Sequence, residues 1–421
     1  MSVSSFIASK TFGRKHASFS GFIIRLTTAA VALSISVMII AVCIIKGFRS
    51  EISEKVFGFW GHIHITQINS HEFQEVPIID TMQWVQDLKD LEKESVTDNE
   101  LGSFQEPVAY FHRTAHLSAI LQTEKEIEGL IMKGVDSLYN WPAFEPYLDT
   151  KDLGLQDFEL SGRNTIISRT TARRLSLKEG DQVVLYFIIE GKEIPRRYTV
   201  QGIYHTGIQE FDEKLAFVPL PELRTLLGWS PRQIGGIEVF VSNIEQLEAF
   251  SKYVYFDIVP MDIVARSITQ RLQPIFQWLE LQKVNEQIIL LLMIAICILN
   301  MATGVFILIF ERMRMLGLLT TLGYSQGVLQ RIFLHYSGYI LLRGLFFGNL
   351  IGLGLCAIQY FFHPITLDEE SYYLAYAPIH FDWLKIFWIN ILSSLLILVF
   401  MVLPTLFLRR IDPIRALGFR S

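Results

Sequence analysis

Apolar residues gather in four long runs of this chain, whereas elsewhere they recur at the shorter spacings of strands and short helices. Each run is 19–23 residues long and contains no charged residue. A helix needs roughly 20 apolar residues to cross about 30 Å of hydrocarbon, and four such runs would be very unusual in a soluble protein. We therefore predict four transmembrane helices, at residues 22–45, 288–310, 336–362 and 386–408.

The polar stretch between the first two runs, residues 46–287, shows the patterns of a mixed α/β domain. "GHIHITQI" at 61–68 alternates like a strand. Asp80 can cap a helix through "TMQWVQDLKDLEKE", whose apolar residues fall on one face. Residues 164–204 indicate a strand, a short helix and a strand joined by a tight hairpin to another strand. A helix predicted over 264–287 runs directly into the second span. We expect an α-helical membrane domain of four transmembrane helices, with a large extracytoplasmic mixed α/β domain inserted between helices 1 and 2.

Charge patterning orients these elements. Residues 46–287 hold 24 Lys and Arg against 36 Asp and Glu, whereas the rest of the chain holds 13 against 6. The basic excess lies in residues 1–21, in the segment 311–335 and in the tail 409–421, whereas the loop 363–385 is mainly acidic. Basic residues in short loops mark the cytoplasmic side, so both termini and the 311–335 segment are predicted to be cytoplasmic. The N-terminal residues are basic and carry scattered Phe, which predicts an interfacial helix on the inner leaflet.

Composition agrees with a protein that is part membrane domain and part aqueous domain. The chain is 51% hydrophobic and 19% charged, too apolar for an ordinary soluble protein and too polar for one lying wholly in lipid. The three cysteines, Cys43, Cys297 and Cys356, fall in predicted spans, so the 46–287 domain must fold without disulfides. The first span is longer than the apolar part of a signal peptide and lacks a small-residue cleavage site, which favours an uncleaved anchor.

The sequence offers no catalytic motif. It contains no G-x-x-x-x-G-K-[ST] phosphate loop and no G-x-S-x-G, H-E-x-x-H or C-x-x-C. His62 and His64 stand two apart on one strand face and could ligate a metal, but a satisfied or solvated strand face is the stronger interpretation. We expect a chain that is not an enzyme and that binds no cofactor or metal itself.

The third span carries a glycine row, Gly344, Gly348 and Gly352, at four-residue spacing. Glycines at this spacing lie on one face of a helix and let another helix approach closely. The partner helix could belong to this chain or to a second subunit.

The segment 311–335, here called the coupling segment, is polar and basic between two apolar runs. Residues 313–322 can form a short amphipathic helix, Gly323 suits the position that ends it, and Ser325 can cap the next helix. A short helix attached directly to two spans is suited to receive a push from a cytoplasmic motor, although it could also lie on anionic lipid.

A family resemblance now becomes visible. "ERMRMLGLLTTLGYSQGVLQRIF" at 311–333 resembles the E-[KR]-x-x-E-[IV]-G-[IL]-L-x-x-x-G coupling segment of four-span ABC permeases. This group includes the lipoprotein-releasing permeases (LolC/LolE type), the macrolide exporter and the cell-division permease. "IKGFRSEI", "LSLKEGDQVVL", "YTVQGIYHTGIQEFDEKLAFVPL" and "DPIRALGFR" extend the likeness over nearly the whole chain. The stretch from "GDQVVL" to "YHTGIQEFD" is most typical of the lipoprotein-releasing branch.

The resemblance implies a permease subunit that extracts lipoproteins from the outer leaflet of the bacterial inner membrane for sorting to the outer membrane. Its implied partners are a cytoplasmic ABC ATPase subunit that binds the ATP, a second permease subunit in a homo- or heterodimer, lipoprotein substrates, a periplasmic lipoprotein carrier and membrane lipids. No nucleic acid partner is implied.

Carried over by position, the resemblance also implies site residues. The ATPase contacts would be Arg312, Met313, Met315, Leu316, Gly317, Leu319 and Gly323. Gly47 and Phe48, at the outer end of the first span, would border the cleft through which lipoproteins enter.

The sequence departs from the family pattern at two places. Met315 stands where the family has an acidic residue, which puts that ATPase contact in question. The hairpin at 186–200 is short where one branch has a long carrier-recruiting loop, so a partner permease could supply that function instead. Two alternatives stay open: an exporter of peptides or small molecules, and a mechanotransmitting permease that regulates a periplasmic cell-wall hydrolase.

Overall fold

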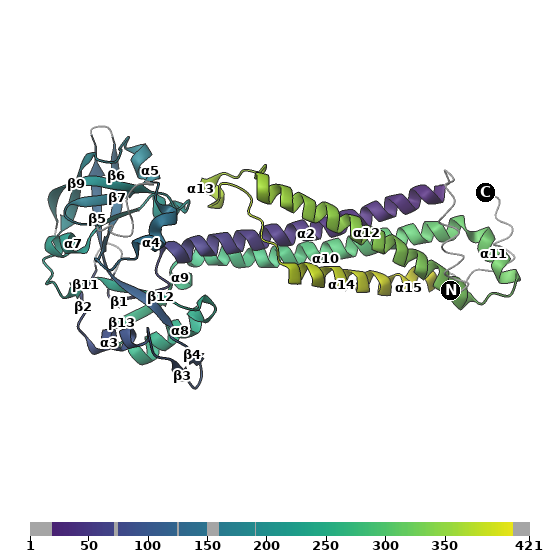
Figure 1. The fold of residues 1–421 in the computed structure, drawn as a ribbon, viewed down its shortest axis with the longest axis horizontal. Helices are drawn as coiled ribbons and strands as arrows, with labels where there is room; N and C mark the ends of the chain where they lie inside the picture. Colours follow the sequence, from purple (N-terminus) through teal and green to yellow (C-terminus); the bar gives the residue numbers. More distant parts are fainter. Residues whose placement is uncertain (1–18, 71–74, 124–125, 150–159, 190, 407–421) are drawn as a thin grey trace. The chain divides into compact units, whose positions relative to one another are not determined.

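The computed structural model describes residues 19–70, 75–123, 126–149, 160–189 and 191–406 (Figure 1). The chain divides into two compact units. The helical unit comprises Met1–Ser50, Trp278–Thr366 and Tyr376–Ser421, and the α/β unit comprises Glu51–Gln277 and Leu367–Ala375. The predicted interfacial helix lies outside the described residues up to residue 18, and the predicted tail 409–421 lies wholly outside them.

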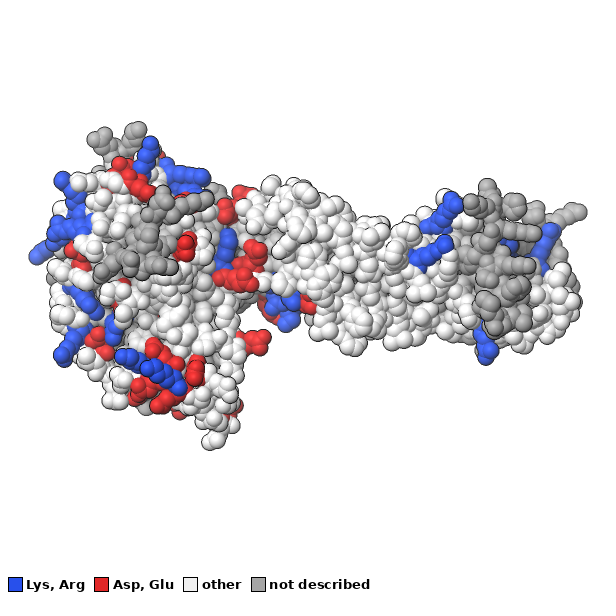
Figure 2. Space-filling view, in the orientation of Figure 1, with Lys and Arg blue, Asp and Glu red and all other residues white. Residues whose placement is uncertain are grey.

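Four helices of the described chain are long and apolar enough to cross a membrane. They span Gly21–Phe59, Gln273–Glu311, Gln326–Phe362 and Trp383–Thr405. The corresponding helices are α2 (Phe19–Phe59), α10 (Gln273–Glu311), α12 (Gln326–Phe362) and α14 (Trp383–Phe400), with α15 (Val402–Leu406) after α14. On the face shown in Figure 2, charged side chains of the helical unit gather at its two ends, and the stretch between them is free of them. This is the distribution expected of a unit that passes through hydrocarbon.

The helical unit has its own apolar core. Buried residues of α2, α10, α12 and α14 form one cluster, which includes Ile35, Met301, Ile340 and Ile397. The helix α12 has 37 residues, or about 55 Å at 1.5 Å per residue. It is therefore longer than about 30 Å of hydrocarbon requires.

The α/β unit is built on a nine-stranded mixed sheet with the strand order β13-β1-β12-β5-β6-β10-β7-β9-β8. An additional pairing joins β5 to β8, so the six strands from β5 to β8 close into a ring. The strands of the sheet are β1 (Ile63–Gln67), β5 (Val108–Gln122), β6 (Ile127–Val135), β7 (Asn164–Ser168), β8 (Gln182–Ile189), β9 (Lys192–Tyr204), β10 (Leu215–Pro219), β12 (Gly236–Val241) and β13 (Ile263–Ser267).

The long strand β5 connects the ring to the open part of the sheet. Its first half pairs with β12, and its second half pairs with β6 and β8. The pairs β6–β10 and β7–β9 are parallel, and the other pairs are antiparallel. The short helices of this unit are α3 (Gln83–Asp90), α4 (Trp141–Phe144), α5 (Arg169–Arg174), α6 (Gln209–Asp212), α7 (Leu220–Leu227), α8 (Leu247–Tyr253), α9 (Ile268–Arg271) and α13 (Glu369–Tyr372).

The smaller elements complete the unit. Two further strand pairs, β2 (Ile78–Ile79) with β11 (Gln233–Ile234) and β3 (Val96–Asp98) with β4 (Gly102–Phe104), lie outside the main sheet. Three helical turns are η1 (Glu145–Tyr147), η2 (Ile244–Gln246) and η3 (Val254–Ile258).

The predicted fold class is confirmed, and two local predictions are wrong. Residues 264–267 are not helical but belong to strand β13, because five residues in register give β1 its second neighbour in the sheet. Asp80 does not cap α3: the N-cap is Met82, and Asp80 Oδ2 lies 3.1 Å from Arg113 Nε on β5. Asp80 therefore forms an ion pair with Arg113 and does not cap a helix.

Candidate functional site

The coupling segment contains a helix with a well-defined end. Helix α11 spans Met313–Thr321 and is separated from α10 by Arg312. At its C-terminus the Gly323 N–H donates to the Thr320 carbonyl and the Tyr324 N–H to the Leu319 carbonyl, each at 3.1 Å. This hydrogen-bond pair is the Schellman motif, and it requires the left-handed φ of +87° that Gly323 adopts. Ser325 is the N-cap residue of α12, although its side chain makes no capping hydrogen bond.

The two faces of α11 differ in what they offer to a partner. Leu316 and Gly317 are buried and face the core of the helical unit, and Met313 and Leu319 are partly buried against it. Met315 and Arg312 are half-buried, and Gly323 is exposed. The residues of α11 and its C-cap that are exposed are Arg314, Leu318, Thr321 and Leu322. Sequence reasoning missed this outer face, although the period of the apolar residues could have separated the two faces.

The end of the first span that carries Gly47 is held by its own chain. A Cβ built on Gly47 would lie 2.5 Å from the carbonyl oxygen of Pro378, so only glycine lets this segment pack on α2. The ring of Phe48 makes an edge contact with Trp278 on α10, with centroids 6.4 Å apart. Phe48 thus lies at a contact between the first and second membrane helices.

Ion pairs join the helices near the same end. Lys46 Nζ lies 2.6 Å from Asp382 Oδ2 and Lys385 pairs with Glu286, so α2, α10 and the start of α14 are connected. The hydrogen bond from Lys46 holds the pKa of Asp382 below its ordinary value, and the Lys385 N–H adds to this effect. Asp382 is also the N-cap of α14, since its Oδ1 accepts from the Lys385 N–H at 3.1 Å.

The glycine row packs against α2 of the same chain. A Cβ on Gly344 would lie 2.5 Å from Val31 Cγ1, and one on Gly348 would lie 2.7 Å from Ile35 Cβ and 2.8 Å from the Ala32 carbonyl oxygen. Gly352 faces Ser36 and Ile39 in the same way. Both helices advance by four residues at each contact, so they run parallel. One turn further on, the buried thiols of Cys43 and Cys356 interact with each other.

The α/β unit contains a polar row that the sequence did not reveal and that is buried except at its end on β13, where Arg266 is exposed. Arg266, His64, Glu238 and His112 are direct cross-strand neighbours on β13, β1, β12 and β5. Lys133 of β6, which is fully buried, donates a 2.8 Å hydrogen bond to Glu238 Oε2. Burial acts to raise the pKa of Glu238, but Lys133 together with His64 and His116 outweighs it and lowers that pKa to about 2. The charged pair is therefore a fixed part of the core.

The predicted metal candidates, His62 and His64, are fully engaged with other groups. The Val241 N–H donates to His62 Nδ1 at 2.9 Å, and His64 Nδ1 accepts from Trp60 Nε1 at 3.2 Å. Burial lowers the pKa of His62 to about 4, and it lowers that of His64 well below the ordinary value. No group of three or more His, Cys, Asp or Glu side chains in the described part of the chain could hold a metal ion.

The residues 367–375 belong to the α/β unit and are tied to it by a histidine. His205 Nδ1 lies 2.9 Å from Asp212 Oδ2, and its Nε2 lies 3.1 Å from Glu369 Oε1. The hydrogen bond to Asp212 raises the pKa of His205, and Glu369 adds to the rise against the effect of burial. Glu369 is thus part of an ion-pair network.

Two protein families match the chain. Residues 25–254 match the family described as MacB-like periplasmic core domain, and residues 287–413 match the family described as FtsX-like permease C-terminal. The two matches lie on either side of the start of the second membrane helix, and together they account for most of the chain.

Curated proteins and a solved structure add three likenesses. The chain is 23% identical over 385 residues to the lipoprotein-releasing system transmembrane protein LolC of Neisseria meningitidis, covering 88% of this chain and 87% of that protein. It is 19% identical over 420 residues to the corresponding LolE protein of Haemophilus influenzae, covering 96% of each. The extracellular domain of the ABC-type transporter YknZ from Gram-positive bacteria matches with a TM-score of 0.30 and 15% identity, covering 49% of this chain and 99% of that domain.

Proposed function

Because the chain belongs to the ABC-transporter permeases that combine a MacB-like periplasmic core domain with an FtsX-like C-terminal domain, we propose that it is a lipoprotein-releasing permease. The observation that carries this proposal is the similarity to LolC and LolE proteins along nearly the whole chain. Its work is to extract lipoproteins from the outer leaflet of the inner membrane for transfer to the outer membrane.

The energy comes from a separate ATPase subunit that binds the ATP. Removing acyl chains from a bilayer costs about 0.8 kcal/mol for each methylene group that leaves it, so several chains require an external energy source. A cytoplasmic position of α11 and of both termini follows from the basic residues at these places. A periplasmic carrier and a second permease, identical or different, complete the proposed assembly.

Helix α11 is the proposed contact with the ATPase. It is attached to α10 through Arg312 and to α12 through the turn at Gly323, so a force on α11 acts on both helices. Arg312, Met313, Met315, Leu319 and Gly323 remain predicted contacts, and the exposed Leu318 and Leu322 extend them on the outer face. Leu316 and Gly317 anchor α11 to the core of the helical unit, so their part in docking is to hold the helix in position.

The substrate is proposed to enter beside Gly47 and Phe48. Phe48 contacts Trp278, and Arg49 Nη2 lies 4.0 Å from Glu280 Oε2, so this contact between α2 and α10 joins an aromatic pair to an ion pair. Separation of α2 from α10 at this place would open a path from the outer leaflet that has an apolar wall and a charged rim.

The test compares two exposed leucines in the purified complex. Leu322→Glu places a charge on the outer face of α11, and Leu138→Glu places one on the α/β unit, at side chains that are 67% and 69% exposed. We expect Leu322→Glu to lose the co-purifying ATPase and ATP-dependent lipoprotein release in proteoliposomes, and Leu138→Glu to keep both. Retention of the ATPase by the Leu322→Glu protein would remove α11 from the coupling.

Depletion in cells tests the substrate. We expect lipoproteins destined for the outer membrane to accumulate in the inner membrane. Correct sorting together with loss of drug or peptide export would replace lipoprotein release with the exporter function. Correct sorting together with failure of cells to separate would replace it with regulation of a cell-wall hydrolase.

A further inference from the structure

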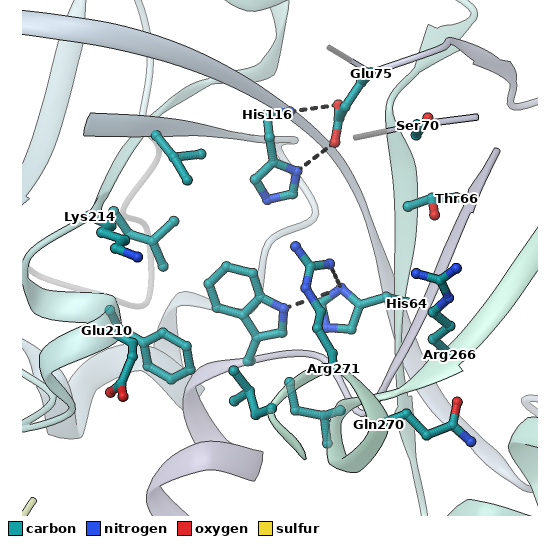
Figure 3. Close-up of a pocket in the computed structure, with 16 residues that line it drawn as sticks. His64, Thr66, Ser70, Glu75, His116, Glu210, Lys214, Arg266, Gln270 and Arg271 are labelled. Carbon is teal, nitrogen blue, oxygen red and sulfur yellow. Dashed lines mark hydrogen bonds and ion pairs between the residues drawn. The ribbon is translucent and has the colours of Figure 1, made fainter. Parts of the chain in front are cut away.

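A pocket of about 540 Å³ opens in the α/β unit between β1, β13, β5 and β10 (Figure 3). Its wall includes the apolar side chains of Trp60, Phe211, Leu215, Ile268 and Leu272. Polar side chains from β1, β5, β13 and α9 also reach it, so the pocket combines an apolar wall with a polar rim. Its volume lies in the range of about 300–1,000 Å³ that is typical of sites for small ligands.

Two buried histidines line this pocket in different states of hydrogen bonding. His64 Nδ1 lies 3.2 Å from the Trp60 Nε1 donor and 3.1 Å from Arg271 Nη1, and its Nε2 lies 3.0 Å from the Gly61 carbonyl, so it is fully engaged. His116 Nδ1 lies 2.8 Å from Glu75 Oε1, whereas its Nε2 has no hydrogen-bond partner. His116 is only 8% exposed. Figure 3 shows this second nitrogen pointing away from Glu75 and into the pocket.

Positive charge dominates the rim. Lys214, Arg266 and Arg271 line the pocket, and all three side chains are exposed. No carboxylate among the described residues lies within ion-pair distance of any of them. The two acids of the rim are engaged elsewhere: Glu75 holds His116, and Glu210 accepts a 3.1 Å hydrogen bond from the Tyr373 hydroxyl. Three cations against two carboxylates leave the rim with a net charge of +1, which favours an anion.

An apolar groove continues from the pocket. It has a volume of about 430 Å³ and shares Ile131 and Lys214 with the pocket. Its other lining includes Ile120 of β5, Gly129 of β6 and Ile188 of β8. A Cβ on Gly129 would have nothing within 4 Å, so the missing side chain leaves this part of the groove open.

We propose that the pocket and the groove form one binding site for an anionic amphiphile, a single alkyl chain with a carboxylate or phosphate headgroup. The headgroup lies among Lys214, Arg271 and the Nε2 atom of His116, and the alkyl chain follows the groove over Gly129. This site lies within the α/β unit, so the inference is independent of the proposed function in lipoprotein release.

The test is photo-crosslinking of the full chain in nanodiscs of phosphatidylcholine. The probes are three diazirine-bearing C16 chains of equal length that end in a carboxylate, a phosphate or a hydroxyl group. We expect the two anionic probes to label peptides of β5 and β6 about tenfold more than the alcohol, since a hydrogen bond to a charged group commonly changes affinity by that factor or more. A preference between carboxylate and phosphate would identify the source of the headgroup.

Variants separate the two parts of the site. Lys214→Gln is expected to lower labelling by the anionic probes about tenfold, whereas Lys192→Gln, at an exposed lysine of β9, leaves it unchanged. Gly129→Leu adds a side chain to the groove at a position where a Cβ meets nothing within 4 Å, and it is expected to abolish labelling by the C16 acid but not by a C4 acid with the same photoreactive group. Equal labelling by the alcohol and the acids, or labelling confined to the membrane helices, would overturn the proposal.

Discussion

The cores of the two units of this chain are packed in different ways. The helical unit brings α2 and α12 together by removing side chains, at Gly344, Gly348 and Gly352. The α/β unit instead places a fully buried lysine and a buried glutamate in the middle of its sheet. In the first unit close packing rests on small residues, and in the second two buried charges neutralise each other away from water.

Breaking the buried pair should give the largest effect. Lys133→Met leaves Glu238 without its cation, and removal of one partner of a buried pair costs about 3–5 kcal/mol of unfolding free energy. Denaturant-dependent hydrogen exchange of β6 and β12 peptides in the full chain measures this loss.

Two further variants test the cause. The double variant Lys133→Met with Glu238→Leu should recover most of the loss, because no buried charge remains. Lys192→Met, at an exposed lysine, should have no measurable effect. A single Lys133→Met variant as stable as the unchanged chain would show that the pair is not essential to the core.

The glycine row offers the matching test in the helical unit. Gly348→Leu would place a Cβ 2.8 Å from a backbone oxygen of α2, where nothing can rotate aside. Overpacking of this kind costs about 1–3 kcal/mol and displaces the backbone. Mild oxidation should cross-link Cys43 to Cys356 in the unchanged chain, and Gly348→Leu should slow this cross-link strongly. Gly354→Leu is the control, since a Cβ there meets nothing within 4 Å.

Acid should affect the α/β unit before it affects the helical unit. Burial lowers the pKa of His62 and His112 to about 4 from 6.5, and lowers that of His64 also. The unfolded chain therefore binds more protons in this range, and stability is lost as the pH falls from about 6.5 toward 4. Hydrogen exchange of β1 and β5 against pH measures the slope. His112→Phe removes one such group and should flatten it, and an unchanged slope would count against this explanation.

The smallest effect is expected at His205, where stability is lost as the pH rises and not as it falls. The pKa of His205 is raised, mainly by its hydrogen bond to Asp212. The contribution of protonated His205 to the stability of this part of the α/β unit is fully present below about pH 6.5. It is lost as the pH rises through the raised pKa. Exchange in residues 367–375, corrected for its intrinsic pH dependence, should increase over that range. His205→Gln should remove the change, and a pH-dependent rise that persists in this variant would rule out His205 as its cause.

The sequence predicted the helical unit well because lipid leaves few alternatives. Uncharged runs long enough to span a bilayer must be helical. The orientation inferred from the short charged loops stays a prediction. The sequence also placed a short helix before Gly323, since a positive φ there needs glycine. It could not show which helix meets the glycine row, because spacing identifies a flat face and not its partner.

The α/β unit was less predictable because its long-range pairings decide its structure. "IVARS" at 263–267 was assigned to the following helix from residue 264, yet its place at the edge of the sheet beside β1 makes it a strand. Lys133 and Glu238 look like surface residues in the sequence, and only the neighbouring strands β6, β5 and β12 bring them together. The pocket beside His116 is invisible in the sequence for the same reason.

The parallel contact between α2 and α12 also limits how these helices can move. The side chains of Val31, Ile35 and Ile39 pack against Gly344, Gly348 and Gly352, so each branched side chain occupies the space that a glycine leaves open. A slide by less than one turn would press a branched side chain onto backbone, and a slide by a full turn, about 5.4 Å, would leave Val31 facing Ile340 or Ile39 facing Cys356 instead of a glycine. A movement transmitted through α11 would therefore carry α2 and α12 together as one rigid pair.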